Sequence, residues 1–243
     1  MTTLEGKWAL VTGASRGIGR EVSIGLAKLG CGVVLHGREE ANCAAVAEAI
    51  AAIGTPVVVV AGELSDQDQV DAVAREALRQ AGQIDILYNN AAIQTTYLSD
   101  PWSFEANEIR RILEVNVISL IRICEHLAPP MLERGWGRIV NVTSGIRDQP
   151  ELFPYAISKA AVDKYVRDFA PRLAGTGVTM NLLDPGWLRT DMGGPNATGD
   201  VASVLPGALV PALLENGVSG QWINAQAFKD LTLDQALAKA VAG

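Results

Sequence analysis

The sequence has few of the residues that build metal sites, disulfides or basic binding surfaces. Its 243 residues include two histidines and three cysteines, and the net charge is −7. Cys31, Cys43 and Cys124 are too few and too widely spaced for a disulfide framework, and we expect them to be buried as small apolar side chains. So few nitrogen and sulfur ligands exclude a clustered metal site. The acidic balance argues against nucleic acid, which requires a basic patch.

Long apolar runs and targeting signals are also missing. No segment approaches the roughly 20 apolar residues of a membrane span, and the first residues, MTTLEGKWALVTG, lack the pattern of a signal peptide. We therefore expect a cytoplasmic protein without a membrane partner. The chain is 49% hydrophobic, and α/β folds of roughly 200–250 residues often form one unit. The expected organisation is a single domain over residues 1–243.

Short aliphatic runs alternate with amphipathic segments along the whole chain. Strands this apolar are typical of a parallel sheet covered by helices on both faces, and the alternation predicts a doubly wound, Rossmann-like α/β fold. The expected strands are Trp8–Thr12, Gly32–His36, Pro56–Ala61, Ile84–Asn89, Gly137–Val142, Val178–Leu183 and Gln221–Asn224. The expected helices are Gly17–Leu29, Glu40–Ile53, Asp66–Ala81, Ser103–Leu132 and the one that begins near Tyr155.

Two segments depart from regular structure in this prediction. The helical region Ser103–Leu132 should be interrupted near Pro129 and Pro130, because proline lacks the N–H that a helix interior needs. The segment 190–205 is rich in Gly, Pro and Asn at its start, which predicts a mobile loop.

A glycine-rich turn, VTGASRGIG, joins the first strand to the first helix. Gly13, Gly17 and Gly19 allow a tight turn, and they let the backbone approach a phosphate at the helix N-terminus. The same letters contain G-x-S-x-G, the nucleophile elbow of hydrolases. That reading needs a histidine late in the chain, and the last one is His126. The turn therefore favours a dinucleotide over a hydrolase site.

The end of the second strand indicates which dinucleotide binds. An acidic residue there usually holds the ribose of NAD, whereas an arginine favours the 2′-phosphate of NADP. This chain reads VVLHGREE, with Gly37 at the place of the acid and Arg38 next to it. Arg16 in the glycine turn can reach the same phosphate, and the planar guanidinium suits it. NADP is therefore the expected cofactor, and NAD is the less favoured one.

Polar residues gather at the carboxyl ends of several expected strands. NNAA begins at Asn89, Ser144 follows the fifth strand, and DPGWLRTDM follows the sixth. In a doubly wound sheet, ligands bind at this edge. Tyr155 and Lys159, in YAISK, stand four residues apart and so share one face of a helix.

These motifs occur in the order that characterises one family. TGASRGIG, NNAA, the asparagine of VNV (Asn116), Ser144, YAISK and DPGWLRTDM together resemble the short-chain dehydrogenase/reductase family. The resemblance covers about Leu4 to Met192. It implies an oxidoreductase that interconverts a carbonyl and a secondary alcohol by hydride transfer, and it also implies a homodimer or homotetramer.

The resemblance also assigns roles to single residues. Tyr155 would be the general acid/base, Ser144 would hydrogen-bond the substrate oxygen, and Asn116 would support a proton relay through Lys159. The Lys159 ammonium, together with an oxidised nicotinamide, would lower the pKa of Tyr155. Lys159 would also hold the nicotinamide ribose. The expected cofactor contacts are Gly13, Ser15, Arg16, Ile18, Gly19, Arg38, Glu63, Leu64, Asn90, Ala91, Tyr155, Lys159, Pro185, Gly186, Leu188 and Thr190.

The sequence departs from the family pattern in a few places. Ala92 replaces a glycine, Glu63 replaces an aspartate, the segment between Ser144 and Tyr155 is short, and SGQWINAQAF replaces the usual end. Two further interpretations stay open. One is a dinucleotide-binding regulator or scaffold without turnover, and the other, within the enzyme reading, is a 3-oxoacyl-type reductase.

Overall fold

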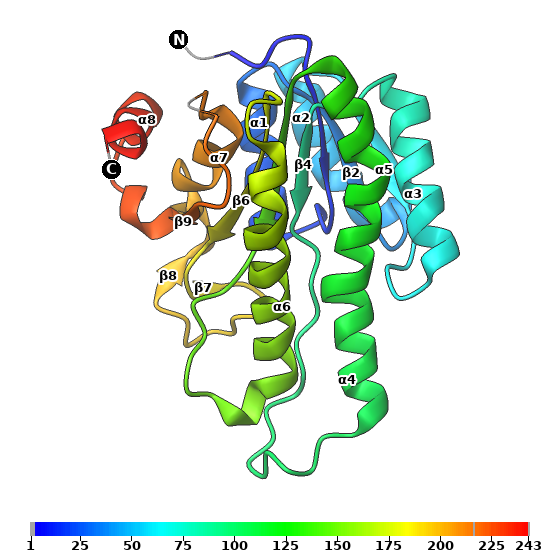
Figure 1. The fold of residues 1–243 in the computed structure, drawn as a ribbon, viewed down its shortest axis with the longest axis vertical. Coiled ribbons are helices and arrows are strands. Elements are labelled where there is room, and N and C mark those ends of the chain that lie inside the picture. Colours follow the sequence, from blue (N-terminus) through cyan, green and yellow to red (C-terminus); the bar gives the residue numbers. More distant parts are fainter. Residues whose placement is uncertain (1–2, 216, 243) are drawn as a thin grey trace.

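A seven-stranded parallel sheet forms the centre of the molecule, in a computed structural model that describes residues 3–215 and 217–242 (Figure 1). The strand order is β3-β2-β1-β4-β5-β6-β9, and every pair is parallel. The strands are β1 (Trp8–Val11), β2 (Gly32–Gly37), β3 (Val57–Ala61), β4 (Ile86–Asn89), β5 (Gly137–Val142), β6 (Val178–Asp184) and β9 (Trp222–Asn224). A separate pair joins β7 (Leu188–Arg189) to β8 (Gly199–Asp200). The predicted doubly wound α/β fold is confirmed.

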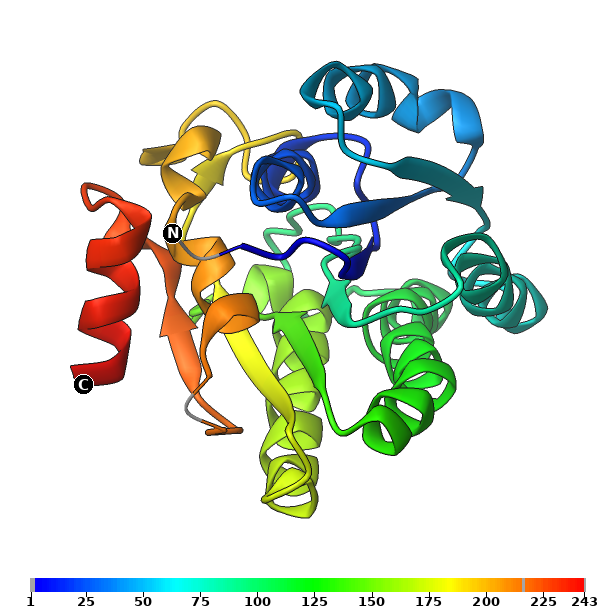
Figure 2. The same cartoon turned by 90° about the horizontal axis from the view of Figure 1, so that it is seen from above.

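Helices cover both faces of the sheet (Figure 2). The α-helices are α1 (Gly17–Lys28), α2 (Ala44–Ile53), α3 (Gln67–Ala81), α4 (Ala106–Leu113), α5 (Ser119–Arg134), α6 (Phe153–Phe169), α7 (Val210–Leu213) and α8 (Leu233–Ala242). The shorter turns are η1 (Glu40–Cys43), η2 (Glu114–Ile118), η3 (Pro150–Leu152), η4 (Ala170–Leu173), η5 (Val201–Val204), η6 (Gly207–Leu209) and η7 (Ala225–Phe228).

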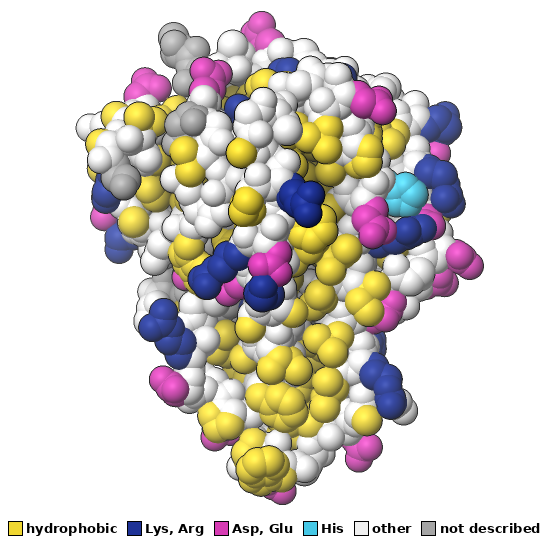
Figure 3. Space-filling view, viewed as in Figure 1, with side chains coloured by type: hydrophobic (Ala, Val, Ile, Leu, Met, Phe, Trp, Pro, Cys, Tyr) yellow, Lys and Arg dark blue, Asp and Glu magenta, His cyan; other side chains and the backbone are white. Residues whose placement is uncertain are grey.

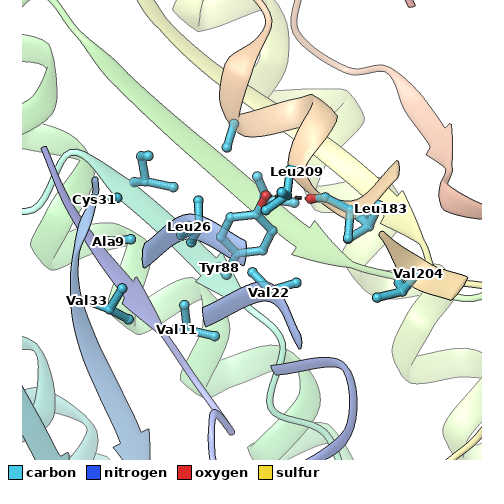
Figure 4. Close-up of a cluster of buried hydrophobic side chains, with 14 of the residues drawn as sticks. Ala9, Val11, Val22, Leu26, Cys31, Val33, Tyr88, Leu183, Val204 and Leu209 are labelled. Atoms are coloured by element: carbon cyan, nitrogen blue, oxygen red, sulfur yellow. Dashed lines mark hydrogen bonds between the residues drawn. The ribbon is translucent and has the colours of Figure 1, made fainter. Parts of the chain in front are cut away.

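The two faces of the sheet bury separate cores because side chains alternate along each strand. On β1, Ala9 and Val11 face the core that includes α1 and α2, whereas Leu10 faces the core that includes α3, α5 and α6. Tyr88 on β4 is fully buried among Val22, Leu26 and neighbouring side chains (Figure 4). Its hydroxyl donates to the carbonyl of Ala208 at 2.6 Å, so the C-terminal part of the chain is bonded to the central strand.

Local sequence explains several helix ends. Asp66 caps α3 by accepting hydrogen bonds from the backbone of Asp68 and Gln69, as an N-cap aspartate does. Gly54 and Gly135 end α2 and α5 in the left-handed conformation, which glycine adopts without a Cβ penalty.

The predicted interruption at Pro129 and Pro130 is wrong. Both prolines lie inside α5, and the helical region changes at η2, where five residues form a π-helical turn. The prolines fall in the second half of α5, where Leu127 and Met131 are fully buried. Packing of these side chains offsets the two hydrogen bonds that proline removes.

The three cysteines are free and buried, as expected for small apolar side chains. Burial raises the pKa of Cys31 to about 12. Burial thereby favours the protonated thiol of this residue over the thiolate.

Candidate active site

One large cavity opens at the carboxyl ends of the strands, around the point where the strand order reverses between β1 and β4. Its volume is about 1350 Å³. Of the residues that the sequence nominates, only Gly19 and Asn116 are not in its wall. The lining includes Gly13, Ser15, Arg16, Ile18, Arg38, Glu63, Leu64, Asn90, Ala91, Ser144, Tyr155, Lys159, Pro185, Gly186, Leu188 and Thr190.

The glycine turn is shaped so that side chains would obstruct it. Gly13 and Gly17 have φ of 64° and 56°, a region that favours glycine. A Cβ on Gly19 would lie 2.3 Å from the carbonyl oxygen of Gly13. Helix α1 begins at Gly17 and has no side-chain cap, so its first N–H groups are free to bind an anion. This turn therefore fits the phosphates of a dinucleotide.

Two neighbours that the sequence did not single out brace this turn. His36 on β2 accepts a hydrogen bond from the N–H of Gly13 through Nδ1 at 3.2 Å, and its Nε2 lies 3.1 Å from the carbonyl oxygen of Gly62. The imidazole is therefore neutral with the proton on Nε2, and burial lowers its pKa. Thr12 accepts bonds from the backbone of Asn90 and Ala91 at 3.0 Å.

The Asn90 side chain supports the turn from the other side. Its Nδ2 donates to the carbonyls of Thr12 and Gly13 at 2.9 and 3.1 Å. These bonds fix the glycine turn to the end of β4. The side-chain amide of Asn90 therefore binds the protein backbone, and Asn90 also lines the cavity.

The arginines at the cofactor end differ in their partners. Arg38 is exposed, lines the cavity beyond β2, and forms no ion pair within the described ranges 3–215 and 217–242. Arg16 pairs with Asp191 across the cavity at 3.0 Å, and both side chains are mostly exposed. Arg38 is thus the more available guanidinium for a phosphate.

Ser144, Tyr155 and Lys159 meet where β5 ends and α6 begins. Ser144 and Tyr155 both line this part of the cavity, and an interaction with the Ser144 side chain lowers the pKa of the phenol. Lys159 lies one turn beyond Tyr155, with its Nζ 5.6 Å from the centre of the phenol ring. The ammonium donates to the carbonyl of Val142 at 2.8 Å, which fixes it against the strand. The three polar groups therefore share one side of the cavity.

Burial dominates the ionisation of Tyr155 and Lys159 in the absence of cofactor. It is the largest cause that raises the pKa of Tyr155 to about 12; Ser144 lowers this pKa and the charge of Asp184 raises it by smaller amounts. Burial also lowers the pKa of Lys159 to about 8. A lowering of the Tyr155 pKa by Lys159 and an oxidised nicotinamide stays a prediction for the complex with cofactor.

Asn116 is buried in the π-helical turn η2 and has its polar atoms engaged. Its Oδ1 accepts from the N–H of Ile93 at 2.8 Å, and its Nδ2 donates to the carbonyl of Ile93 and to Ser158 Oγ. The side chain therefore ties η2 to the segment after β4 and to α6. It does not line the cavity itself.

The segment after β6 is held in place by the C-terminal part of the chain. Gly186 has φ of 78°, and its N–H donates to Asp184 Oδ1 at 3.0 Å. Gln226 on η7 donates to the carbonyl of Pro185 at 2.9 Å. Sequence reasoning missed Gln226 and Asp184, since only the packing of β6 against β9 brings the first of them to this edge.

No group of three or more His, Cys, Asp or Glu side chains could hold a metal ion within residues 3–215 and 217–242. Over the same residues, each helix is too short or too polar to cross a bilayer.

Residues 7–200 match the pattern of the short chain dehydrogenase family. The chain belongs to this family of oxidoreductases. The short-chain dehydrogenase is 34% identical over 195 residues to a 3-oxoacyl-[acyl-carrier-protein] reductase of Synechocystis, covering 79% of this chain and 78% of the relative.

Solved structures of this family share the whole fold. A 3-oxoacyl (acyl-carrier-protein) reductase of Agrobacterium tumefaciens with NADP bound superposes with a TM-score of 0.83 at 30% identity, over 92% of this chain and 94% of the other. A gluconate 5-dehydrogenase of Burkholderia cenocepacia, in complex with NADP and tartrate, reaches a TM-score of 0.84 at 27% identity, over 97% and 98%.

Proposed function

We propose that this short-chain dehydrogenase is an NADP-dependent enzyme that interconverts a carbonyl and a secondary alcohol, with Tyr155 as its acid/base. The observation that carries the proposal is that Ser144, Tyr155 and the buried Lys159, whose Nζ is 5.6 Å from the phenol ring, line the same cavity as the uncapped N-terminus of α1. The NADP bound in two structural neighbours supports the choice of cofactor.

Different residues of this chain would bind different parts of the cofactor. The glycine turn and α1 would hold the phosphates, and the unpaired Arg38 would take the 2′-phosphate. Glu63 and Leu64 would line the adenine end, Asn90 and Ala91 the adenosine ribose, and Pro185, Gly186, Leu188 and Thr190 the nicotinamide end. The cofactor supplies the hydride, and the protein supplies position and protons.

At the other end of the cavity, Ser144, Tyr155 and Lys159 would act on the substrate oxygen. Ser144 donates a hydrogen bond to the oxygen, which stabilises the charge that develops there. Tyr155 gives its proton to this oxygen during reduction and removes it during oxidation. Lys159 stabilises the phenolate left behind and holds the nicotinamide ribose, and Asn116 keeps η2 and α6 together beside the proposed proton relay.

Carbonyl reduction requires the protonated form of Tyr155. Burial, the largest cause, raises the pKa of the phenol to about 12, so this form is the one present at neutral pH. Oxidation needs the phenolate, and the positive charge of an oxidised nicotinamide favours that form.

A substrate panel tests this proposal against a regulator that binds dinucleotides without turnover. Purified protein is mixed with NADPH or NADH and with ketones, 3-oxoacyl thioesters, sugars and steroid ketones, and absorbance is followed at 340 nm. The proposal expects NADPH consumption with at least one carbonyl. Tight NADPH binding without consumption by any carbonyl, and without formation from any alcohol, would favour the regulator.

The 3-oxoacyl thioesters have a particular place in the panel. The relative from Synechocystis and the neighbour from Agrobacterium tumefaciens are described as 3-oxoacyl-[acyl-carrier-protein] reductases. We propose this substrate class as the first candidate. The segment 190–205, which contains β8 and η5, would close over the bound substrate.

The outer faces of α5 and α6 support a homo-oligomer. Large apolar side chains are exposed at Leu132 on α5 and at Ile157 and Phe169 on α6. Figure 3 shows apolar side chains gathered on the face that carries α4, α5 and α6. We propose that a second copy of the chain covers this face, in a dimer or tetramer, and sedimentation of the purified protein tests it.

A further inference from the structure

Three large apolar side chains in the wall of the cavity are exposed instead of being packed in a core. Tyr97, Trp187 and Met192 line the cavity that also holds Tyr155, and they are 60%, 57% and 40% exposed. Exposed apolar groups that gather around one cavity mark a binding surface. The proposed function gives none of these three side chains a role.

The segment between β4 and α4, which carries the exposed tyrosine, is attached to the start of α6. The N–H of Leu98 donates to the carbonyl of Glu151 at 3.3 Å. The rings of Phe104 and Phe153 meet edge to face, with their centroids 5.0 Å apart. Figure 1 shows this segment running along the lower end of the molecule. Because Tyr155 follows Glu151 by one helical turn, these contacts hold the segment beside the proposed acid/base.

The segment after β6 fixes the indole of Trp187 on the same side of the cavity. The indole N–H donates to the carbonyl of Gly193 at 2.9 Å. This nitrogen is the one polar atom of the side chain, so the exposed part of the indole is apolar. At the start of the segment, Asp184 Oδ2 lies 3.0 Å from where a Cβ on Gly145 would be. Gly145 directly follows Ser144, so this segment adjoins the groups proposed to act on the carbonyl.

Two arginines in the wall offer the alternative of an anionic substrate. Arg111 and Arg147 line the cavity, but both are exposed, so solvent screens their charges. The half-buried Ile146 and Leu152 add further apolar surface to the wall. The hydrogen bond that fixes the indole of Trp187 makes the apolar part of the wall the more rigid one. The geometry therefore favours an apolar ligand.

We propose that Trp187 and Tyr97 form an apolar subsite that selects a carbonyl substrate with a bulky apolar substituent, a chain of several carbons or a ring. The inference rests on the proposed function, because it names the substrate of the same site. A substituent packed against the indole and the Tyr97 ring would cover apolar surface that is exposed without it. A small ketone would leave this surface in water. The chain of a 3-oxoacyl thioester meets the same requirement.

Matched ketones test the subsite by binding alone. 2-Butanone and 2-octanone differ only in chain length, and 7-oxooctanoate is 2-octanone with a carboxylate in place of its last methyl group. The Kd of each is measured by equilibrium dialysis, without cofactor and with saturating NADP⁺, so that no ketone is reduced. Each buried methylene strengthens binding by about fourfold, so wild type should bind 2-octanone at least about tenfold more tightly than 2-butanone. 7-Oxooctanoate should bind more weakly than 2-octanone, because its charge would lose water.

Three variants separate the apolar surface from the segment that carries it. Trp187→Ala removes the indole and should reduce the preference for 2-octanone by about fivefold or more. Trp187→Phe keeps an aromatic ring but lacks the N–H that binds Gly193, and it should retain most of the preference. Trp102→Ala is the matched control, because this tryptophan is 93% exposed and does not line the cavity. It should leave the preference unchanged.

Four results would overturn the inference. They are similar affinities of wild type for 2-butanone and 2-octanone, tighter binding of 7-oxooctanoate than of 2-octanone, an equal loss of preference in Trp102→Ala, and a loss in Trp187→Phe as large as that in Trp187→Ala. The second result would assign this end of the cavity to Arg111 and Arg147. The last would mean that the position of the segment matters and the apolar surface does not.

The dialysis is independent of turnover. If the substrate panel finds no reaction but Trp187→Ala loses the preference while Trp102→Ala keeps it, the proposed function fails and the apolar subsite stands. If a carbonyl is reduced and wild type shows no preference for 2-octanone, the inference about the subsite fails by itself.

Discussion

Replacing Gly19 with alanine should damage the glycine turn from inside helix α1. The new Cβ would lie 2.3 Å from the carbonyl oxygen of Gly13 and 2.6 Å from Asn90 Nδ2. The first contact is with backbone, so the turn itself must shift. Overpacking of this kind costs about 1–3 kcal/mol, and the better helix propensity of alanine offsets about 1 kcal/mol of it. The expected net loss in the free energy of unfolding is about 1 kcal/mol.

The loss of cofactor affinity should be larger than the loss of stability suggests. Gly13 and Asn90 are the groups that the methyl displaces, and both line the cavity where the phosphates would bind. We expect the Kd for NADPH to rise about tenfold or more, which corresponds to about 1.4 kcal/mol. The Kd is measured by NADPH fluorescence, and stability is measured by urea denaturation of the same preparation.

Gly25 on the same helix provides the matched control. A Cβ there would meet the side chain of Leu209 at 3.1 Å, which is tight but flexible, and Gly25 does not line the cavity. Gly25→Ala should change stability slightly and leave NADPH affinity unchanged. Wild-type affinity in Gly19→Ala, or an equal loss of affinity in Gly25→Ala, would refute the reasoning.

Two other perturbations test the cofactor end and the buried ammonium. Arg38→Ala should raise the Kd for NADPH by tenfold to a hundredfold and leave NADH binding unchanged. The reason is that a charge-assisted hydrogen bond to a phosphate contributes roughly 1.5–3 kcal/mol. Equal effects on both cofactors would count against a 2′-phosphate contact. In Lys159→Met, the free energy of unfolding should lack a rise with pH that the wild-type protein shows. The folded Lys159 loses its proton near pH 8, whereas the unfolded lysine keeps it to about 10.5. The unfolded state binds more protons between these values, so wild-type stability should rise relative to Lys159→Met over this window in urea denaturation; parallel curves would contradict the buried ammonium.

The strands and their alternation with helices could be predicted because each strand carries a local signal. The run Gly137–Val142 is fully buried and lies at the predicted residues, since a strand covered on both faces must be apolar throughout. The helix after it begins two residues before Tyr155, with Phe153 and Pro154 in its first turn. Once the strands and helices were assigned, the parallel fold alone predicted that the polar residues after each strand lie at the carboxyl edge of the sheet.

The parts that failed depend on packing that is distant in sequence. The prolines of α5 are tolerated because of buried neighbours, and the break at η2 accompanies the hydrogen bonds that Asn116 makes to Ile93 and Ser158. The roles of His36 and Gln226 arise from contacts across the fold, at 3.2 Å to Gly13 and 2.9 Å to Pro185. No local pattern marks either residue.

The pKa of Tyr155 in the absence of cofactor shows a related limit in energetic terms. The spacing of YAISK correctly places an ammonium beside the phenol, but the depth of burial is a tertiary property. Desolvation is the largest cause of the shift, and the charge of Asp184 adds to it. A pair of residues four apart can therefore be recognised from the sequence, while the balance of charges around it cannot.

Turnover by Tyr155→Phe is the most direct test of the central claim. The phenylalanine keeps the ring in its buried position and removes only the hydroxyl that would transfer the proton. With the carbonyl that the wild-type enzyme reduces, we expect kcat/KM to fall about 10²–10⁴-fold, while the Kd for NADPH stays within about twofold of wild type. A Tyr155→Phe protein that reduces this carbonyl at the wild-type rate would contradict the account.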